Sequence, residues 1–119
     1  MFINLSNHPV GSWSKEQIEA TKIYGEIIEY PFPQISVSIS DEEMNRLVSK
    51  YFELIMKHDQ PVVMLQGEFV FVFRLVTRLK KAGIKVLAAC SERVATEVEG
   101  VDGSRIKTSE FRFACYREF

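Results

Sequence analysis

The chain alternates short apolar runs with amphipathic segments, and this order constrains its fold more than any other feature. The runs at 2–5, 26–30, 61–66 and 84–90 have the length of β-strands, and the last two are almost continuously apolar. Strands of that kind are buried on both faces, as in a parallel sheet covered by helices. The alternation therefore predicts an α/β fold, a Rossmann-like parallel sheet flanked by helices.

The first two helices between these strands are predicted from their end signals. Ser14 and Ser40 are expected N-caps, and each is followed three positions later by a residue that completes a capping box, Gln17 and Glu43. The first helix is expected to end at Gly25, because glycine commonly terminates helices. These signals predict two helices that begin directly after Ser14 and Ser40.

The segment 69–82 is predicted to form a third helix that ends at Gly83. Its expected core face consists of apolar side chains that recur at helical spacing: Phe69, Val72, Phe73, Val76 and Leu79. Phe71 and Leu75 are then left on a second apolar face. A strand over 69–73, paired with strand three across 66–68, is the alternative interpretation.

The C-terminal third alternates apolar and polar residues from Arg93 to Glu99 and again from Phe111 to Arg117. Such alternation is typical of strands with one buried face, and Asp102-Gly103 between them is a turn signal. The pattern predicts a C-terminal antiparallel β-hairpin with a type I′ turn, separate from a fourth strand that ends at Cys90.

Length and composition are those of one globular domain, residues 1–119. The chain is 46% hydrophobic and contains no apolar run long enough to span a membrane, and its two cysteines, expected to be free thiols, favour a cytoplasmic protein. Its 15 basic and 16 acidic residues argue against a protein that coats long nucleic acid. Cys90 and Cys115 lie in apolar runs and are expected to be buried free thiols, and no metal site or cofactor is expected.

The carboxyl ends of parallel strands meet at one edge of a sheet, where such folds bind ligands. Three loops are expected at this edge, at 6–13, 66–68 and 91–93. Lys80, Lys81 and Lys85 are expected at the opposite edge, away from a ligand. The carboxyl edge is therefore the predicted site.

Several side chains in these loops suit a phosphate, and each also has a purely structural interpretation. Ser6, Asn7 and His8 offer polar groups beside a helix N-terminus, or they close a turn. Gly67 permits close backbone approach, or simply connects two elements. Arg93 suits a phosphate, or lies on the surface. The remaining candidates are Trp13, which could stack on a base or staple the first helix, with Gln66, Glu68, Phe69, Ser91 and Glu92.

Four motifs in this order resemble a known family. They are Asn4 to Pro9 followed by Trp13-Ser14, then Gly67-Glu68 before a Phe-rich helix, then Ser91-Glu92-Arg93, and a closing Phe111-Arg112-Phe113. Together they resemble small CRISPR-associated proteins of type III systems, which are related to the Rossmann-like CARF domains that sense cyclic oligoadenylates.

The resemblance implies a homodimer that binds cyclic tetra-adenylate across its twofold axis and cleaves it as a metal-independent ring nuclease. In such a reaction a ribose 2′-OH attacks the adjacent phosphate. Arg93 is the expected partner of the charge that develops on phosphorus, and His8 the expected proton acceptor or positioning group. Ser6, Asn7 and Gly67 are the expected phosphate contacts.

Three other functions are compatible with the sequence. The protein could sense or sequester the same ligand without cleaving it, bind a different nucleotide or metabolite, or bind a partner protein through Phe71 and Leu75. The chain contains neither a dinucleotide fingerprint nor a Walker A motif nor a nucleophile elbow.

Overall fold

The computed structural model describes all 119 residues and contains the three predicted helices, but it has one strand fewer than predicted, because the strands predicted at 84–90 and 93–99 form one strand. Strands and helices alternate up to β4, and two 3₁₀ turns, Val10–Ser12 and Lys22–Tyr24, flank the first helix. The elements are β1 (Phe2–Ser6), α1 (Lys15–Thr21), β2 (Ile27–Glu29), α2 (Asp41–Met56), β3 (Val62–Gln66), α3 (Phe69–Lys81), β4 (Lys85–Glu99) and β5 (Arg105–Glu118).

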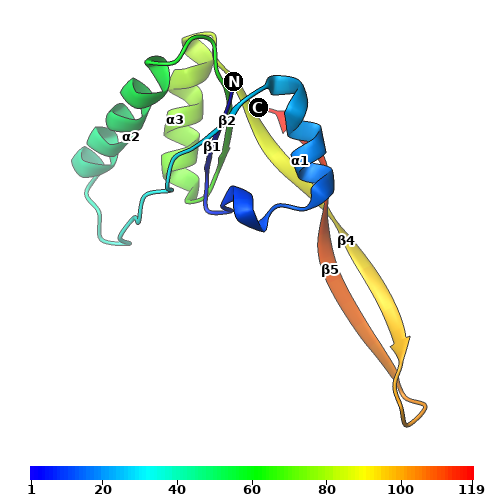
Figure 1. Cartoon of the computed structure of the whole chain (residues 1–119). Helices are drawn as coiled ribbons and strands as arrows, with labels where there is room; N and C mark the ends of the chain where they lie inside the picture. Colours follow the sequence, from blue (N-terminus) through cyan, green and yellow to red (C-terminus); the bar gives the residue numbers. More distant parts are fainter.

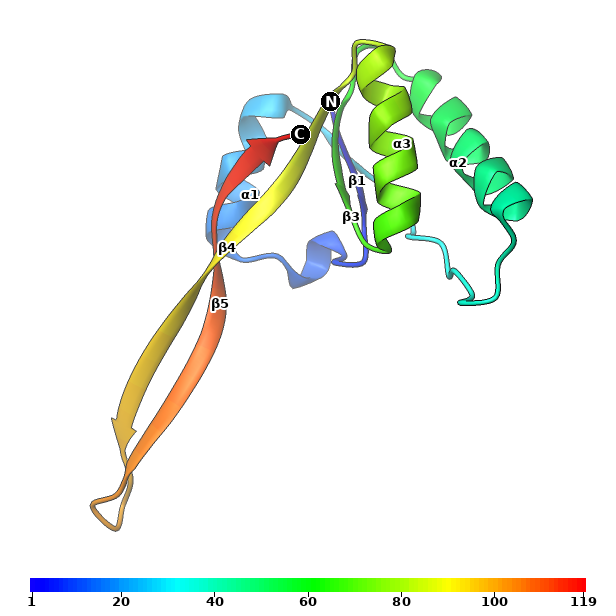
Figure 2. The ribbon, with the colours of Figure 1, turned by 180° about the vertical axis from the view of Figure 1, so that it is seen from behind.

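The five strands form one sheet in the order β2-β1-β3-β4-β5, which confirms the predicted α/β class. The first three pairings are parallel, and β4 and β5 pair antiparallel. Helices α2 and α3 lie on one face of the sheet and α1 lies on the other (Figures 1 and 2). Because β2 and β3 lie on opposite sides of β1, the winding changes direction between β1 and β3.

Alternate residues of the central strands supply the two halves of the core, as strand geometry requires. Ile3, Leu5, Val63 and Leu65 pack against α2 and α3, and all four are fully buried. Phe2 and Met64 face α1, where Phe2 meets the Trp13 ring edge-on at 6.1 Å. No helix is long and apolar enough to cross a membrane.

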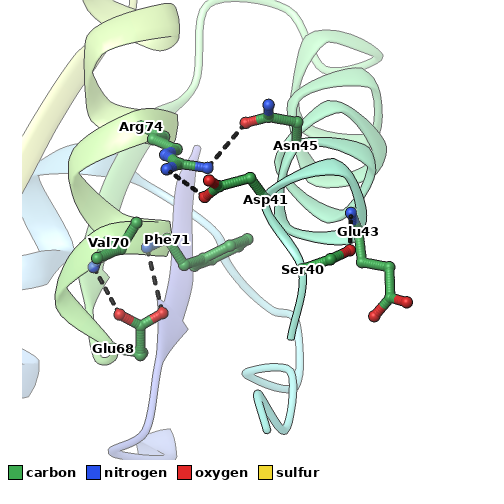
Figure 3. Close-up of polar contacts among 8 residues, drawn as sticks. All are labelled: Ser40, Asp41, Glu43, Asn45, Glu68, Val70, Phe71 and Arg74. Atoms are coloured by element: carbon green, nitrogen blue, oxygen red, sulfur yellow. Dashed lines mark hydrogen bonds and ion pairs between the residues drawn. The ribbon is translucent and has the colours of Figure 1, made fainter. Parts of the chain in front are cut away.

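Both predicted N-caps are confirmed. Ser14 Oγ accepts a hydrogen bond from Gln17 N at 3.2 Å, and Ser40 Oγ accepts one from Glu43 N at 3.1 Å (Figure 3). In α1 the Gln17 side chain donates to the Tyr116 hydroxyl instead of returning to the cap. That hydrogen bond connects α1 to β5.

Residues 69–81 are helical, so the alternative strand over 69–73 is wrong. The predicted core face of this helix is also partly wrong. Phe71 and Leu75 are fully buried, whereas Phe69 and Phe73 are 89% and 73% exposed. The helix carries apolar side chains on two faces, and the Phe71 face contacts both Phe32 and Tyr51 edge-on. The face expected to be free for a partner is therefore core.

The prediction that a fourth strand ends at Cys90, followed by a loop at 91–93, is wrong. Strand β4 continues without a break to Glu99, because no glycine or proline interrupts it and β5 pairs with it from Leu87 to Glu99. The two strands project beyond the helices as a two-stranded ribbon (Figure 1). We define the arm as residues 92–112 of this ribbon.

The hairpin is confirmed, but its turn is not type I′. A type I′ turn needs positive φ at both central residues, whereas in this loop only Gly103 has it, at 81°. Gly103 N donates to Gly100 O at 3.0 Å, which makes a three-residue loop closed by Gly100 and Ser104. Two hydrogen bonds from Ser104 to the Asp102 carboxylate lower the pKa of that group.

The two cysteines are free, as expected, and lie directly opposite each other in the β4–β5 ladder. The expectation that both are buried is wrong, because Cys90 is half-buried and Cys115 is exposed. Helix α3 packs on β3 and β4 rather than on β5, so it leaves Cys115 uncovered.

The Tyr116 hydroxyl connects β5 to α1, and we expect it to make the free energy of unfolding depend on pH. It lies 2.8 Å from Thr21 Oγ1 and 3.3 Å from Gln17 Nε2, and burial raises the pKa of Tyr116. The unfolded chain therefore ionises this tyrosine first, near pH 10, and wild-type stability falls as the pH rises further. Tyr116→Phe should cost about 1 kcal/mol at neutral pH, where the hydroxyl bonds are intact.

Above pH 10 the stability difference between the two proteins should narrow, because the phenylalanine variant has no hydroxyl to ionise at this position. Urea unfolding midpoints of wild type and variant at neutral and alkaline pH measure this difference. A constant difference across the range would contradict the prediction.

Candidate functional site

A cavity of about 270 Å³ opens at the carboxyl edge of the sheet, beside the point where the winding changes direction. Open α/β sheets bind ligands at such points. Residues of β1's following loop, α1, β3, β4 and β5 line it: His8, Ser12, Trp13, Ser14, Gln17, Met64, Gln66, Ala89, Ser91, Phe111 and Phe113. Four of the predicted site residues, His8, Trp13, Gln66 and Ser91, thus meet in one hollow.

The loop that carries His8 is held by hydrogen bonds to its backbone. The His8 carbonyl accepts from Asn4 Nδ2 and from Trp13 Nε1, both at 3.0 Å, and His8 N donates to Ser6 Oγ at 3.2 Å. Ser6 and Trp13 are buried, so both shape the loop from inside. The His8 side chain is left exposed and lines the cavity.

Two residues outside the predicted set fix this loop. Asn4 is fully buried in β1 and also donates to Glu29 Oε2 at 3.2 Å. The same carboxylate oxygen accepts from Val10 N at 2.6 Å, which ties the loop to β2. An asparagine inside an otherwise apolar strand is the one sequence signal that could have identified this network, because buried polar groups require partners.

Gln66 extends the sheet with its side chain. Its amide donates from Nε2 to Ala89 O at 3.2 Å, and its Oε1 accepts from Ala89 N at 3.1 Å. These two bonds reproduce a backbone ladder beyond Met64–Leu87, the last backbone pair between β3 and β4. Gln66 therefore holds β4 in place at the floor of the cavity.

Strands β4 and β5 provide an aromatic and cationic wall. Ser91 pairs with Phe113 and Arg93 pairs with Phe111, and residues directly opposite in a ladder point to the same face. Because Ser91, Phe111 and Phe113 line the cavity, Arg93 extends that wall outward. The Arg93 guanidinium donates to Ser109 Oγ at 3.2 Å and has no acidic partner within ion-pair distance.

A β-bulge positions the aromatic part of this wall. Cys90 pairs with Cys115 but Ser91 pairs with Phe113, so one residue of β5, Ala114, is extra. A bulge changes the alternation of side chains locally. As a result Phe113 and Tyr116, three positions apart, meet with ring centroids 5.0 Å apart.

The residues of the loop after β3 that are expected to bind a ligand contact other parts of the protein instead. The Glu68 carboxylate accepts from Val70 N at 2.6 Å and from Phe71 N at 3.3 Å, so it occupies the N-terminus of α3 (Figure 3). The Phe32 ring covers Gly67 so closely that a Cβ there would lie 2.2 Å from a ring carbon. Phe69 projects into solvent on α3, and none of these three lines the cavity.

Ser6, Asn7 and Glu92 do not line the cavity either, and Ser6 lies beside Asn7. Asn7 lines a separate hollow of about 450 Å³ on the β2 side, with Glu29, Tyr30 and Phe32 among its walls. Glu92 neighbours Arg93 on β4 and therefore faces the opposite side of the ribbon, where it pairs with Arg112.

Most basic side chains of α3 lie away from the cavity and already have partners. Arg74 is used between α2 and α3, where it donates to Asp41 and Asn45, each at 3.0 Å (Figure 3). Lys80 contacts the C-terminal Phe119, at the other end of α3 from its Phe69 start. Arg93 does not line the cavity itself; it lies opposite Phe111, on the same face of the ribbon. No three His, Cys, Asp or Glu side chains gather where they could hold a metal ion.

Fold and site together define a Rossmann-like α/β domain with a cavity at the carboxyl edge of its sheet. The chain belongs to the MJ1673 family, described as "Uncharacterized protein MJ1673 family", whose model matches residues 1–117. No curated protein and no solved structure gives a significant match.

Proposed function

We propose that this protein binds a nucleotide in the cavity, with a base against Phe111 and Phe113 and a phosphate at Arg93. The observation that carries the proposal is the ladder register, which places Arg93 opposite Phe111 on the face of the cavity wall. Aromatic rings stack on bases of any sequence, and a guanidinium matches the geometry of a phosphate. The exposed His8 side chain adds a polar group to the cavity lining, and Gln66 holds the floor through its hydrogen bonds to Ala89.

We further propose, on the resemblance of the four motifs to CRISPR-associated CARF-related proteins, that the ligand is cyclic tetra-adenylate bound by a homodimer. A twofold ligand suits an isologous dimer, because each protomer presents the same wall to half of the ring. Two copies also double the small number of cations near the ligand, which strengthens the local field. The near-neutral chain is compatible with such a compact anion.

In the proposed cleavage, a ribose 2′-oxygen attacks the adjacent phosphorus while the bond from phosphorus to the 5′-oxygen breaks. The 2′-OH proton passes to His8, and the departing 5′-oxygen takes a proton from water. Arg93 stabilises the negative charge that grows on the phosphate oxygens. The products are linear di-adenylates with a 5′-hydroxyl and a 2′,3′-cyclic phosphate.

Incubation of the purified protein with cyclic tetra-adenylate in EDTA, with protein in excess over ligand, tests the proposal. Di-adenylate with a 2′,3′-cyclic phosphate is the expected product. Intact ligand that co-elutes with the protein would support the sensor alternative and refute cleavage. If AMP or another mononucleotide binds and the cyclic ligand does not, only the general nucleotide proposal stands. Absence of binding for every nucleotide at micromolar protein would refute both.

A further inference from the structure

The arm formed by β4 and β5 makes this chain far less compact than its length allows. Its radius of gyration is 17.5 Å, against about 13.5 Å for a compact domain of this length. No residue of the arm, 92–112, is buried. An isolated two-stranded ribbon is marginally stable in water, and three strands or a packed surface are normally required.

The outer half of the arm has one apolar and one charged face, whereas nearer the sheet Glu92, Glu110 and Arg112 lie on the same side as Val98, and the exposed Phe111 lies on the other side. Val98 and Ile106 are ladder partners, and next to them Thr96 pairs with Thr108, with hydroxyls 2.6 Å apart. The opposite face carries Glu97 with its ion-pair partners Arg105 and Lys107. Alternation of this kind is typical of a strand with one buried face, yet Val98 and Ile106 are 56% and 54% exposed.

A second apolar patch is exposed at the start of α3, and it comprises Phe69, Val70 and Phe73. Helix α3 begins at the carboxyl edge of the sheet, and the arm leaves the sheet at this same edge (Figure 2). The apolar face of the arm is on the α3 side of the sheet, because it continues the Val86 and Cys90 side of β4, where Val86 packs in the α3 core.

We infer that two copies of this chain exchange arms, so that the apolar face of each arm packs on the Phe69–Phe73 patch of the other copy. One twofold axis generates both contacts and covers both exposed patches. The inference supplies the interface of the proposed dimer, but the interface itself does not require a ligand.

Charge and area both favour a second copy as the occupant. The arm contains five acidic and four basic residues, so two arms do not repel each other and do not attract a polyanion. Five exposed apolar side chains per protomer, Val98 and Ile106 on the arm with Phe69, Val70 and Phe73 on α3, supply about 500 Å² of apolar surface at roughly 100 Å² each. A standard interface needs roughly 800 Å² per partner, of which about two-thirds is apolar in homodimers.

Sedimentation of the nucleotide-free protein over a concentration series tests this inference. The wild type should sediment at twice the chain mass of 13.7 kDa. Ile106→Lys on the arm and Phe73→Lys on α3 should each shift the protein to the monomer mass. Both side chains are exposed in the protomer, so circular dichroism should be unchanged. Val98→Lys, at the ladder partner of Ile106, provides a second arm variant if the first fails to fold.

Ala95→Lys is the matched control, because it places the same charge on the other face of the same arm and should leave the dimer intact. A wild type that is monomeric at every concentration would overturn the inference, as would a dimer that survives substitution on either patch. Since no nucleotide is present, a dimer that binds no nucleotide would refute the proposed function and leave this interface standing.

Discussion

Arg93→Ala is expected to reduce cleavage of cyclic tetra-adenylate by about 10²–10³-fold, because one donor that stabilises developing charge contributes roughly that factor. Arg93 is exposed and makes a single hydrogen bond, to Ser109. Its removal should therefore change the free energy of unfolding by less than about 0.5 kcal/mol. The rate constant under single-turnover conditions and the ligand dissociation constant should be measured together. A loss confined to the dissociation constant would show that Arg93 binds the ligand without acting in the reaction.

Arg112→Ala is the control that matches this change most closely. Arg112 lies on the same ribbon but on its opposite face, opposite Glu92 and paired with Glu110 at 2.7 Å. Lys80→Ala removes a cation from the far end of α3. Neither should slow cleavage by more than about twofold, which is within the effect of a remote surface charge. Equal losses for Arg93 and Arg112 would contradict the placement of the site on the cavity wall.

The parallel part of the fold could be predicted because each of its signals is local. Ser14 and Ser40 cap their helices, and Gly83, with φ of 79°, follows α3. The apolar runs at 61–66 and 84–90 require a covered sheet, whichever way its strands are ordered. Each signal depends on residues a few positions apart, so no tertiary information was needed.

The length of β4 could not be predicted in the same way. Period-two alternation through Arg93 to Glu99 is identical for a strand that continues β4 and for a separate hairpin strand. Pairing with β5 decides between these two structures, and its paired residues are as many as 31 positions apart in the sequence, as for Leu87 and Glu118. A prediction from local pattern therefore placed Ser91, Glu92 and Arg93 in a loop.

Only those site residues whose positions follow from local pattern and strand order could be predicted from the sequence. His8 and Gln66 follow β1 and end β3, so the topology alone brings them to one edge. Phe111 and Phe113 reach that edge only through the register of β5 and its bulge at Ala114, which depend on long-range pairing. Trp13 and Ser6 face inward, because their hydrogen-bonding groups meet the backbone of the His8 loop.

Alanine substitutions on the two apolar faces of α3 test which face contributes more to the free energy of unfolding. Phe71→Ala should lower the free energy of unfolding by about 3–5 kcal/mol, because removal of a fully buried phenylalanine leaves a cavity. Phe71 is completely buried and meets Phe32 and Tyr51 edge-on at 5.5 and 5.6 Å. That loss is a large part of the total stability of a typical domain, about 5–15 kcal/mol.

Phe73→Ala, two residues along the same helix, is the matched control, and it should cost less than about 1 kcal/mol because Phe73 is exposed. Both should be made in the Ile106→Lys background, so that subunit association does not enter the measured stability. The single tryptophan, Trp13, is buried against Phe2, and its fluorescence reports urea unfolding. The helical spacing of Phe69, Val72, Phe73, Val76 and Leu79 predicts the opposite ranking. A larger loss in the free energy of unfolding for Phe73→Ala than for Phe71→Ala would therefore show that the Phe73 face packs in the core. The ranking expected from the structure leaves Phe73 free to meet a second copy.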